Sequence, residues 1–156
     1  MSKAAISEVR SVLIPLADRQ LLLPNAVVAE IMGYQQPEAV EGQPDWFLGN
    51  MVWRGVLIPV ISFEAMLGGG VVTPGHRGRI AIMNGLNGYP RLSHFGMVVQ
   101  AIPSLVRVST ENVLALPAAS DANPLIQQAV ELDLNPAYIP NLDEIERQLQ
   151  DVVSKL

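Results

Sequence analysis

The chain has 156 residues, of which 49% are hydrophobic and 16% charged, and its 10 basic and 15 acidic side chains give a net charge of −5. Plentiful apolar surface with little charge excludes an intrinsically disordered chain, and the acidic balance argues against nucleic-acid binding, which needs a basic face. The absence of cysteine excludes a disulfide framework, a catalytic thiol and thiolate metal sites.

The first third of the chain predicts short β-strands separated by turn residues. Apolar runs at 11–17 and 20–24 flank a polar turn and indicate a first hairpin. A third strand is expected over 27–34. The polar segment 35–45 that follows, with two prolines and three acidic residues, is expected to be an exposed loop.

The clearest strand pair lies in the middle of the chain. The runs 51–53 and 56–61 stand on either side of Arg54 and Gly55, and a glycine at the second turn position provides the positive φ that a tight hairpin requires. One turn of helix is expected over 63–67.

The second half predicts further strands after a glycine-rich crossing at 68–79, where we place an internal seam between two subdomains. Strands are expected at 79–84, 94–102 and 105–110. The run 125–134 predicts a last long strand, although its imperfect alternation leaves a helix possible. Every long apolar stretch is interrupted before the ~18 residues that a membrane span needs, so we expect a soluble, cytoplasmic protein.

The C-terminus predicts an amphipathic helix. Asn141 is suited to the N-cap, and Glu144 follows three residues later, as in a capping box. Apolar residues then recur on one stripe, at Leu142, Ile145, Leu149 and Val152 or Val153. We expect this helix to pack on its own domain, which spans residues 8–153 after a disordered segment 1–7.

No catalytic constellation is apparent. His76 and His94 have no partner at metal-ligand spacing, and we expect each to be solvated or capping. The glycines at 68–70 and 85–88 lack the residues that complete a phosphate-binding loop. We therefore predict a non-catalytic module with no cofactor and no metal ion.

One turn has the composition of a binding surface. Arg54 is preceded by Trp53, and Trp46 and Met51 are near in sequence; tryptophan and arginine are enriched at interface hot spots. The alternative, that both tryptophans fill the core, is permitted by their apolar neighbours.

Three segments, VVAEIMGY, FLGNMVWRGVLIPVISFEAMLG and FGMVVQAIPSLVRV, occur in this order. In that order they resemble the CheW-like domain of bacterial chemotaxis coupling proteins, from about Val12 to Leu149. The most specific stretch is similar to the family's Gly-Val-x-Asn-Leu-Arg-Gly-x-x-x-Pro, and the residues retained are Gly49, Arg54, Gly55 and Pro59. A second match is Val28-x-Glu30-Ile31-x-Gly33-Tyr34.

The resemblance implies a mostly β fold of two five-stranded barrels packed around an apolar interface, with a short C-terminal helix. It also implies a cytoplasmic adaptor, recruited to receptor arrays, that bridges the tips of membrane chemoreceptors to a CheA-type histidine kinase. The family's receptor contact includes the residues matched by Arg54 and Gly49, and positions matching Val28 and Glu30 belong to partner surfaces. With the neighbouring Trp53 and Gly55, these form the expected partner-binding site.

Departures from the family pattern point to a specialised member. The family's Asn is Val52 here and its Leu is Trp53, while its Asp-Leu-Arg becomes Ser62-Phe63-Glu64. Glu64 in place of arginine is expected to change partner choice, because like charges opposed at an interface are disfavoured. The resemblance extends to coupling proteins that control type IV pili or twitching motility.

Two other functions remain open from the sequence. A small-molecule-binding β-barrel or enzyme would require a cavity with convergent polar groups. A structural subunit would self-associate through an exposed strand edge.

Overall fold

The computed structural model describes residues 8–117 and 123–156. The predicted disordered segment 1–7 lies outside the described residues. Within them the chain forms eleven strands, two α-helices and a short 3-10 helix, in the order β1 (Val9–Pro15), β2 (Gln20–Pro24), η1 (Asn25–Val27), β3 (Val28–Gly33), β4 (Phe47–Trp53), β5 (Val56–Ile61), α1 (Phe63–Met66), β6 (Arg79–Asn84), β7 (His94–Val99), β8 (Ser104–Val108), β9 (Val113–Ala115), β10 (Ile126–Leu132), β11 (Asn135–Pro140) and α2 (Leu142–Val153).

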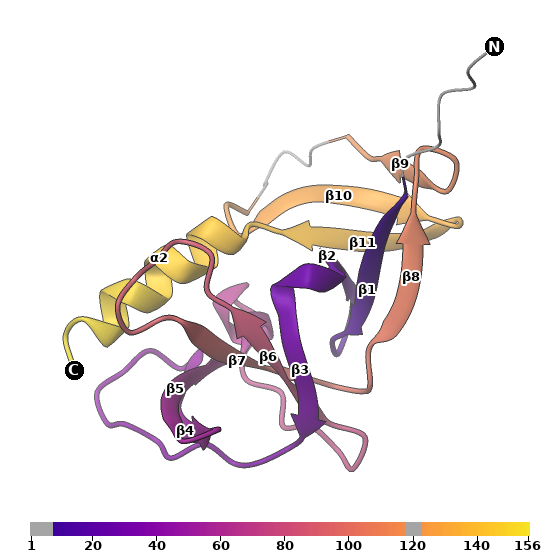
Figure 1. Ribbon diagram of the computed structural model, residues 1–156. Coiled ribbons are helices and arrows are strands. Elements are labelled where there is room, and N and C mark those ends of the chain that lie inside the picture. The colour runs from indigo at the N-terminus through magenta and orange to yellow at the C-terminus, as the bar shows by residue number, and fades with distance from the viewer. Residues whose placement is uncertain (1–7, 118–122) are drawn as a thin grey trace.

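The strands form two sheets that occupy different halves of the molecule (Figure 1). One sheet has five strands in the order β3-β6-β7-β5-β4, and the other has six in the order β8-β1-β2-β11-β10-β9. The predicted mostly β fold with two β subdomains and a C-terminal helix is thus confirmed. The second sheet has one strand more than expected because the three-residue strand β9 pairs with β10 at its edge.

The glycine-rich segment 68–79 is not where the chain changes sheets. It connects α1 to β6, and the strands on either side, β5 and β6, belong to the same five-stranded sheet. The chain enters this sheet after β2 through η1 and leaves it after β7. Glycine content marks a connection, but it carries no information about which strands pair across it.

Three hydrophobic clusters explain why so many strands are apolar on both faces. In β6, Ile80 and Ile82 point into a cluster inside the five-stranded sheet, whereas Ala81 and Met83 point into the main core. Successive side chains of a strand point to opposite faces, so a sheet covered on both sides needs a continuous apolar run. A third cluster, around Leu22 and Val130, lies inside the six-stranded sheet.

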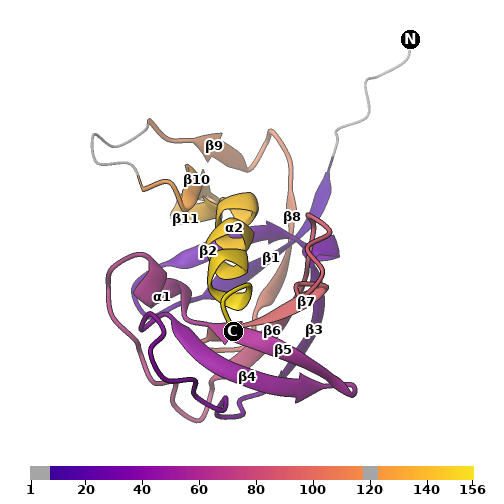
Figure 2. The same cartoon turned by 90° about the vertical axis from the view of Figure 1, so that its left-hand side faces the viewer.

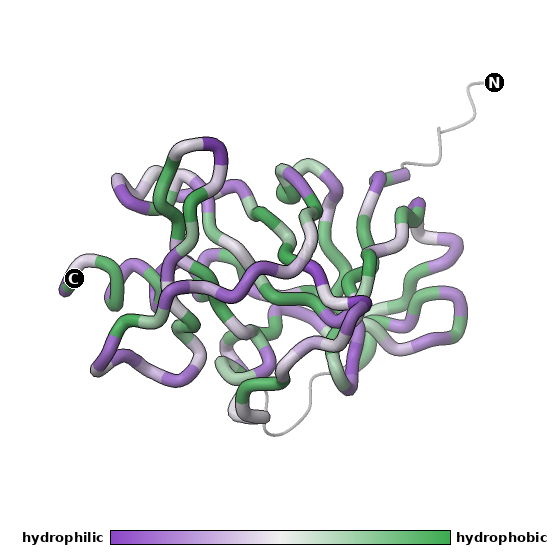
Figure 3. The backbone as a smooth tube through the Cα atoms, turned by 90° about the horizontal axis from the view of Figure 1, so that it is seen from below, coloured by the Kyte–Doolittle hydropathy of each residue, from purple (hydrophilic) through white to green (hydrophobic). Residues whose placement is uncertain are grey.

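Helix α2 joins the two halves. Figure 2 shows it lying between the two sheets, and its residues Ile145 and Leu149 are fully buried in the main core with side chains from both. The prediction that this helix packs on its own domain is therefore confirmed. Elsewhere in the molecule, hydrophobic residues concentrate along the interior strands, whereas many peripheral turns are hydrophilic (Figure 3).

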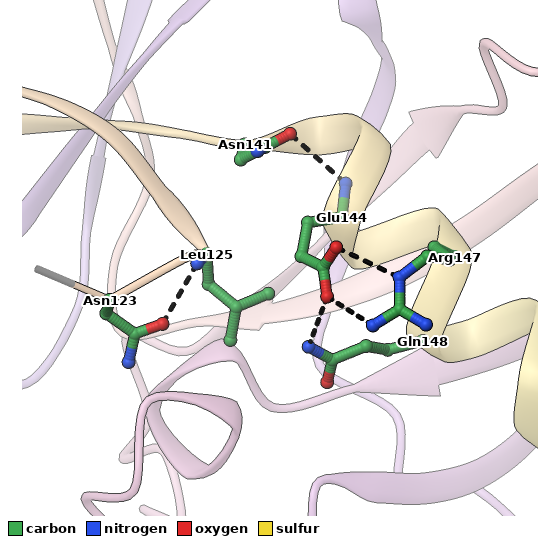
Figure 4. Close-up of polar contacts among 6 residues, drawn as sticks. All are labelled: Asn123, Leu125, Asn141, Glu144, Arg147 and Gln148. Carbon is green, nitrogen blue, oxygen red and sulfur yellow. Dashed lines mark hydrogen bonds and ion pairs between the residues drawn. The ribbon is translucent and has the colours of Figure 1, made fainter.

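The start of α2 is capped as predicted (Figure 4). The Asn141 side chain accepts a hydrogen bond from the Glu144 backbone N–H at 3.1 Å. The Glu144 carboxylate does not return to the N-cap; it accepts from the Arg147 guanidinium at 2.6 Å and from the Gln148 amide at 2.9 Å. These bonds, chiefly the one from Arg147, lower the pKa of Glu144 to about 2.

The strand predicted over 125–134 is confirmed as β10, which excludes a helix there, but it is not the last strand, because β11 follows it. The run contains β10, Ile126–Leu132, and ends in the turn residues Asp133 and Leu134, whose φ values are 48° and 72° and which lead into a further strand, β11. Neither is glycine, so the usual hairpin signal is missing, and Pro136 inside β11 argues locally against a strand.

Candidate functional site

The β4–β5 turn is the predicted tight hairpin. Trp53 and Val56 are the last paired residues, and the two residues between them, Arg54 and Gly55, have φ values of 48° and 78°. Positive φ at both central positions is the geometry of a type I′ turn, which suits the twist of two antiparallel strands. An arginine in this conformation costs of order 1–3 kcal/mol, so the surrounding contacts must hold it there.

Glu30 supplies those contacts from β3. Its carboxylate Oε1 accepts a hydrogen bond from the Arg54 guanidinium at 2.8 Å and lies 3.3 Å from the Trp53 indole N–H. The guanidinium also lies over the Trp53 ring, 5.0 Å from the ring centroid. One carboxylate, one indole and one guanidinium therefore fix each other, although the arginine side chain remains 72% exposed.

These contacts connect the two edges of the five-stranded sheet. Strands β3 and β4 stand at opposite ends of its strand order, yet Glu30 of β3 contacts the residues that end β4. Figure 2 shows the tip of the β4–β5 hairpin ending close to β3. The side-chain contacts thus close the sheet upon itself and place the turn on a rigid support.

The sequence missed two features of this region. The His94 ring, at the start of β7, packs at a tilt against Trp53 with ring centroids 4.7 Å apart, so this histidine belongs to the support and is only half exposed. Val52 and Leu57 lie directly opposite each other in register and are 59% and 63% exposed. The sequence signal for this exposed apolar pair was Val52, which stands where the family pattern has Asn. That Leu57 lies on the same face as Val52 could be known only from the pairing of the two strands.

We call the group Glu30, Val52, Trp53, Arg54, Val56 and Leu57 the hairpin surface. It contains a tryptophan and an arginine that contact each other, which are residue types enriched at interface hot spots, and it adds exposed aliphatic side chains that form an apolar patch. A groove of about 460 Å³ borders it, lined by Val56 and Leu57, by the loop at 90–93 and by the end of α2. A partner that covered the hairpin would therefore also reach the end of α2.

Two of the predicted site residues have roles in the fold. Gly49 is buried, with φ 134°, and a side chain there would overlap the backbone carbonyl of Glu38. The backbones of Glu38 and Asn50 exchange hydrogen bonds of 2.8 and 2.9 Å, which anchor the largely exposed loop 35–45 on β4. Val28 is half-buried and packs against the main core.

Glu64 is the third predicted site residue that the structure separates from the others. It lies on α1 with only 5% of its surface exposed, and its carboxylate accepts a hydrogen bond from the Ala17 backbone N–H at 2.7 Å. Burial raises its pKa. Because this carboxylate is buried, a partner protein cannot contact it directly. The structure therefore does not support the expected effect of Glu64 on partner choice.

A cavity of about 660 Å³ at one end of the six-stranded sheet is the place where a small ligand would be sought. Its polar lining residues are Asp18, Arg19, Gln20, Asp133 and Asn135. None of them is buried, and Arg19 is already engaged by Asp18 and by the Tyr138 ring. The cavity therefore offers no desolvated polar group to orient a substrate.

The described residues hold no group of three His, Cys, Asp or Glu side chains that could bind a metal ion. Over the same part of the chain, no helix has the length and apolar character needed to cross a membrane.

Comparison with known proteins identifies the family. The model of the CheW-like domain matches residues 10–150. The crystal structure of the scaffolding protein TtCheW from Thermoanaerobacter tengcongensis is similar, with a TM-score of 0.74 and 19% identity over 91% of this chain and 90% of that one. No match was found among curated proteins. With a family match over most of its length and the same fold, this chain belongs to the CheW-like domain family.

Proposed function

We propose that this chain is a non-catalytic adaptor that couples membrane chemoreceptors to a CheA-type histidine kinase, and that the hairpin surface is part of the contact. Membership of the CheW-like family supports the scaffold role. The observation that carries the site is the pairing of Arg54 with Glu30 and Trp53, which holds an exposed cation at the tip of a hairpin that also exposes aliphatic residues. Such an adaptor works in the cytoplasm, at receptor arrays.

The residues that depart from the family pattern favour a specialised member. Val52 and Trp53 both belong to the hairpin surface, where they replace a polar and an aliphatic residue of the family pattern. A more apolar surface favours a partner with an apolar patch of its own. We infer a coupling protein dedicated to one signalling system, of the kind that controls type IV pili.

The Arg54→Asn variant tests the site. Asparagine tolerates positive φ, so the turn is retained while the guanidinium is lost. We expect the Kd for a chemoreceptor cytoplasmic fragment or a kinase regulatory fragment from the same source to rise about 5- to 150-fold, which corresponds to 1–3 kcal/mol. The free energy of unfolding is expected to change by less than about 1 kcal/mol, because the ion pair is exposed. Isothermal titration calorimetry and chemical denaturation provide the two values.

Arg107→Asn is the matched control. Arg107 is 69% exposed and pairs with Glu8 at 3.8 Å, but it lies on β8 in the other sheet. Its substitution is expected to leave both Kd values unchanged. Unaltered binding by Arg54→Asn would contradict the proposed site, whereas absence of binding to both fragments by the unmodified chain would contradict the proposed function itself.

A further inference from the structure

The two sheets are connected by a buried carboxylate that forms no ion pair with any residue the structure describes. Glu64 is on α1, which follows β5 of the five-stranded sheet, and Ala17 is in the β1–β2 turn of the six-stranded sheet. The bond between the Glu64 carboxylate and the Ala17 N–H, at 2.7 Å, therefore spans from one half of the molecule to the other. The Gln100 amide, just after β7, lies 3.4 Å from both carboxylate oxygens.

The groups around Glu64 do not neutralise the negative charge of its carboxylate. Among residues 8–117 and 123–156 Glu64 forms no ion pair. The charged group that acts on Glu64 from the β1–β2 turn is the carboxylate of Asp18, which is itself paired with the Arg19 guanidinium at 3.3 Å. From the segment after β7 Glu64 meets only the neutral amide of Gln100. A buried anion with one backbone donor, one long amide contact and a neighbouring carboxylate is poorly compensated.

We propose that Glu64 is a charge-dependent clasp between the two sheets: the β1–β2 turn is held most firmly against α1 when this carboxyl group is neutral, and ionisation of Glu64 favours release of the turn. A neutral carboxyl group still offers its carbonyl oxygen to the Ala17 N–H, so protonation keeps the bond and removes the cost of burying a charge. Release of the turn gives an open form in which water solvates the ionised carboxylate, and this solvation stabilises the open form relative to the closed form.

The direction of the pH dependence follows from the same environment. Burial is the largest cause of the raised pKa of Glu64, and it outweighs the hydrogen bonds from Ala17 and Gln100, which lower the pKa. When the turn is released the pKa returns toward its ordinary value. The closed form therefore binds the proton more tightly than the open form, and it loses stability as pH rises from the ordinary pKa to the raised one.

Amide hydrogen exchange of the full chain tests the clasp. We expect the protection of the Ala17 amide, corrected for the intrinsic exchange rate, to fall as pH rises through the titration of Glu64 and then to level off. The fall is tenfold for each unit by which the closed-form pKa exceeds the open-form pKa. In Glu64→Gln, which keeps the acceptor and removes the charge, we expect high protection at every pH and a free energy of unfolding at pH 7 at least equal to that of the unmodified chain.

Glu146→Gln is the control for a buried carboxylate in general. Glu146 on α2 is 1% exposed and accepts backbone N–H groups of Leu86 at 2.9 Å and Asn87 at 3.2 Å, far from the β1–β2 turn in sequence. Its substitution is expected to leave the pH dependence at Ala17 unchanged. A carboxyl ¹³C titration of the unmodified chain gives an independent readout, with the Glu64 midpoint expected above 4.5. A midpoint at or below that value, or Ala17 protection that falls equally in Glu64→Gln, would overturn the proposal.

Discussion

Replacement of Gly49 by alanine is expected to lower the free energy of unfolding by about 3 kcal/mol or more, the combined scale of backbone strain and overpacking. The backbone at Gly49 has φ 134°, a conformation that residues with a side chain rarely adopt, and the new methyl group would overlap the Glu38 carbonyl. Relief requires the loop 35–45 to leave β4, which breaks the paired hydrogen bonds between Glu38 and Asn50. Chemical denaturation of the purified variant measures the change.

Gly33→Ala is the matched control for this variant. Gly33 ends β3, has no unusual φ, and a methyl group there would meet nothing within 4 Å. A change within about 0.5 kcal/mol is expected, as for most exposed positions. Equal destabilisation by the two substitutions would contradict the role that we assign to Gly49, namely to let the loop approach the strand. If Gly49 has this role, any weaker partner binding by Gly49→Ala results from displacement of the loop 35–45 and not from loss of a direct contact with Gly49.

The Leu149→Ala variant is expected to lose about 2–5 kcal/mol of stability. Leu149 is fully buried on α2, in the main core where side chains of both sheets meet. Alanine is a good helix former, so the loss comes from the cavity and not from helix propensity. Because α2 packs against both sheets, we expect a single cooperative transition at lower denaturant concentration.

Leu114→Ala provides the comparison. Leu114 is in β9 and is 62% exposed, so the same chemical change should cost less than about 0.5 kcal/mol. Thermal and urea unfolding, followed by circular dichroism, check both variants. A small effect at Leu149 would mean that α2 is not held in the core, and the inter-sheet packing described above would then be incorrect.

Local patterns in the sequence predicted the elements that are built from neighbouring residues. The β4–β5 hairpin followed from Gly55 between two apolar runs, and the start of α2 followed from Asn141. The order of the strands could not be predicted from such patterns, because β2 pairs with β11 and β5 pairs with β7 in parallel across long stretches of chain. The β10–β11 hairpin was missed because its turn residues carry no glycine.

The same distinction applies to the candidate site. Trp53 and Arg54 were identified from their composition, and Glu30 through the resemblance, and the structure brings these three together. The burial of Glu64 could not be predicted, because it depends on where the distant β1–β2 turn packs. The contact of His94 with Trp53 likewise depends on the position of β7 in the sheet.

Backbone chemical-shift mapping on addition of a chemoreceptor cytoplasmic fragment tests the docking surface most directly. We expect the largest shifts at residues 28–31 and 50–57, where β3 and the β4–β5 hairpin carry Glu30, Trp53 and Arg54. Shifts confined to the six-stranded sheet, with the amides of the β4–β5 hairpin unmoved at saturation, would contradict this expectation.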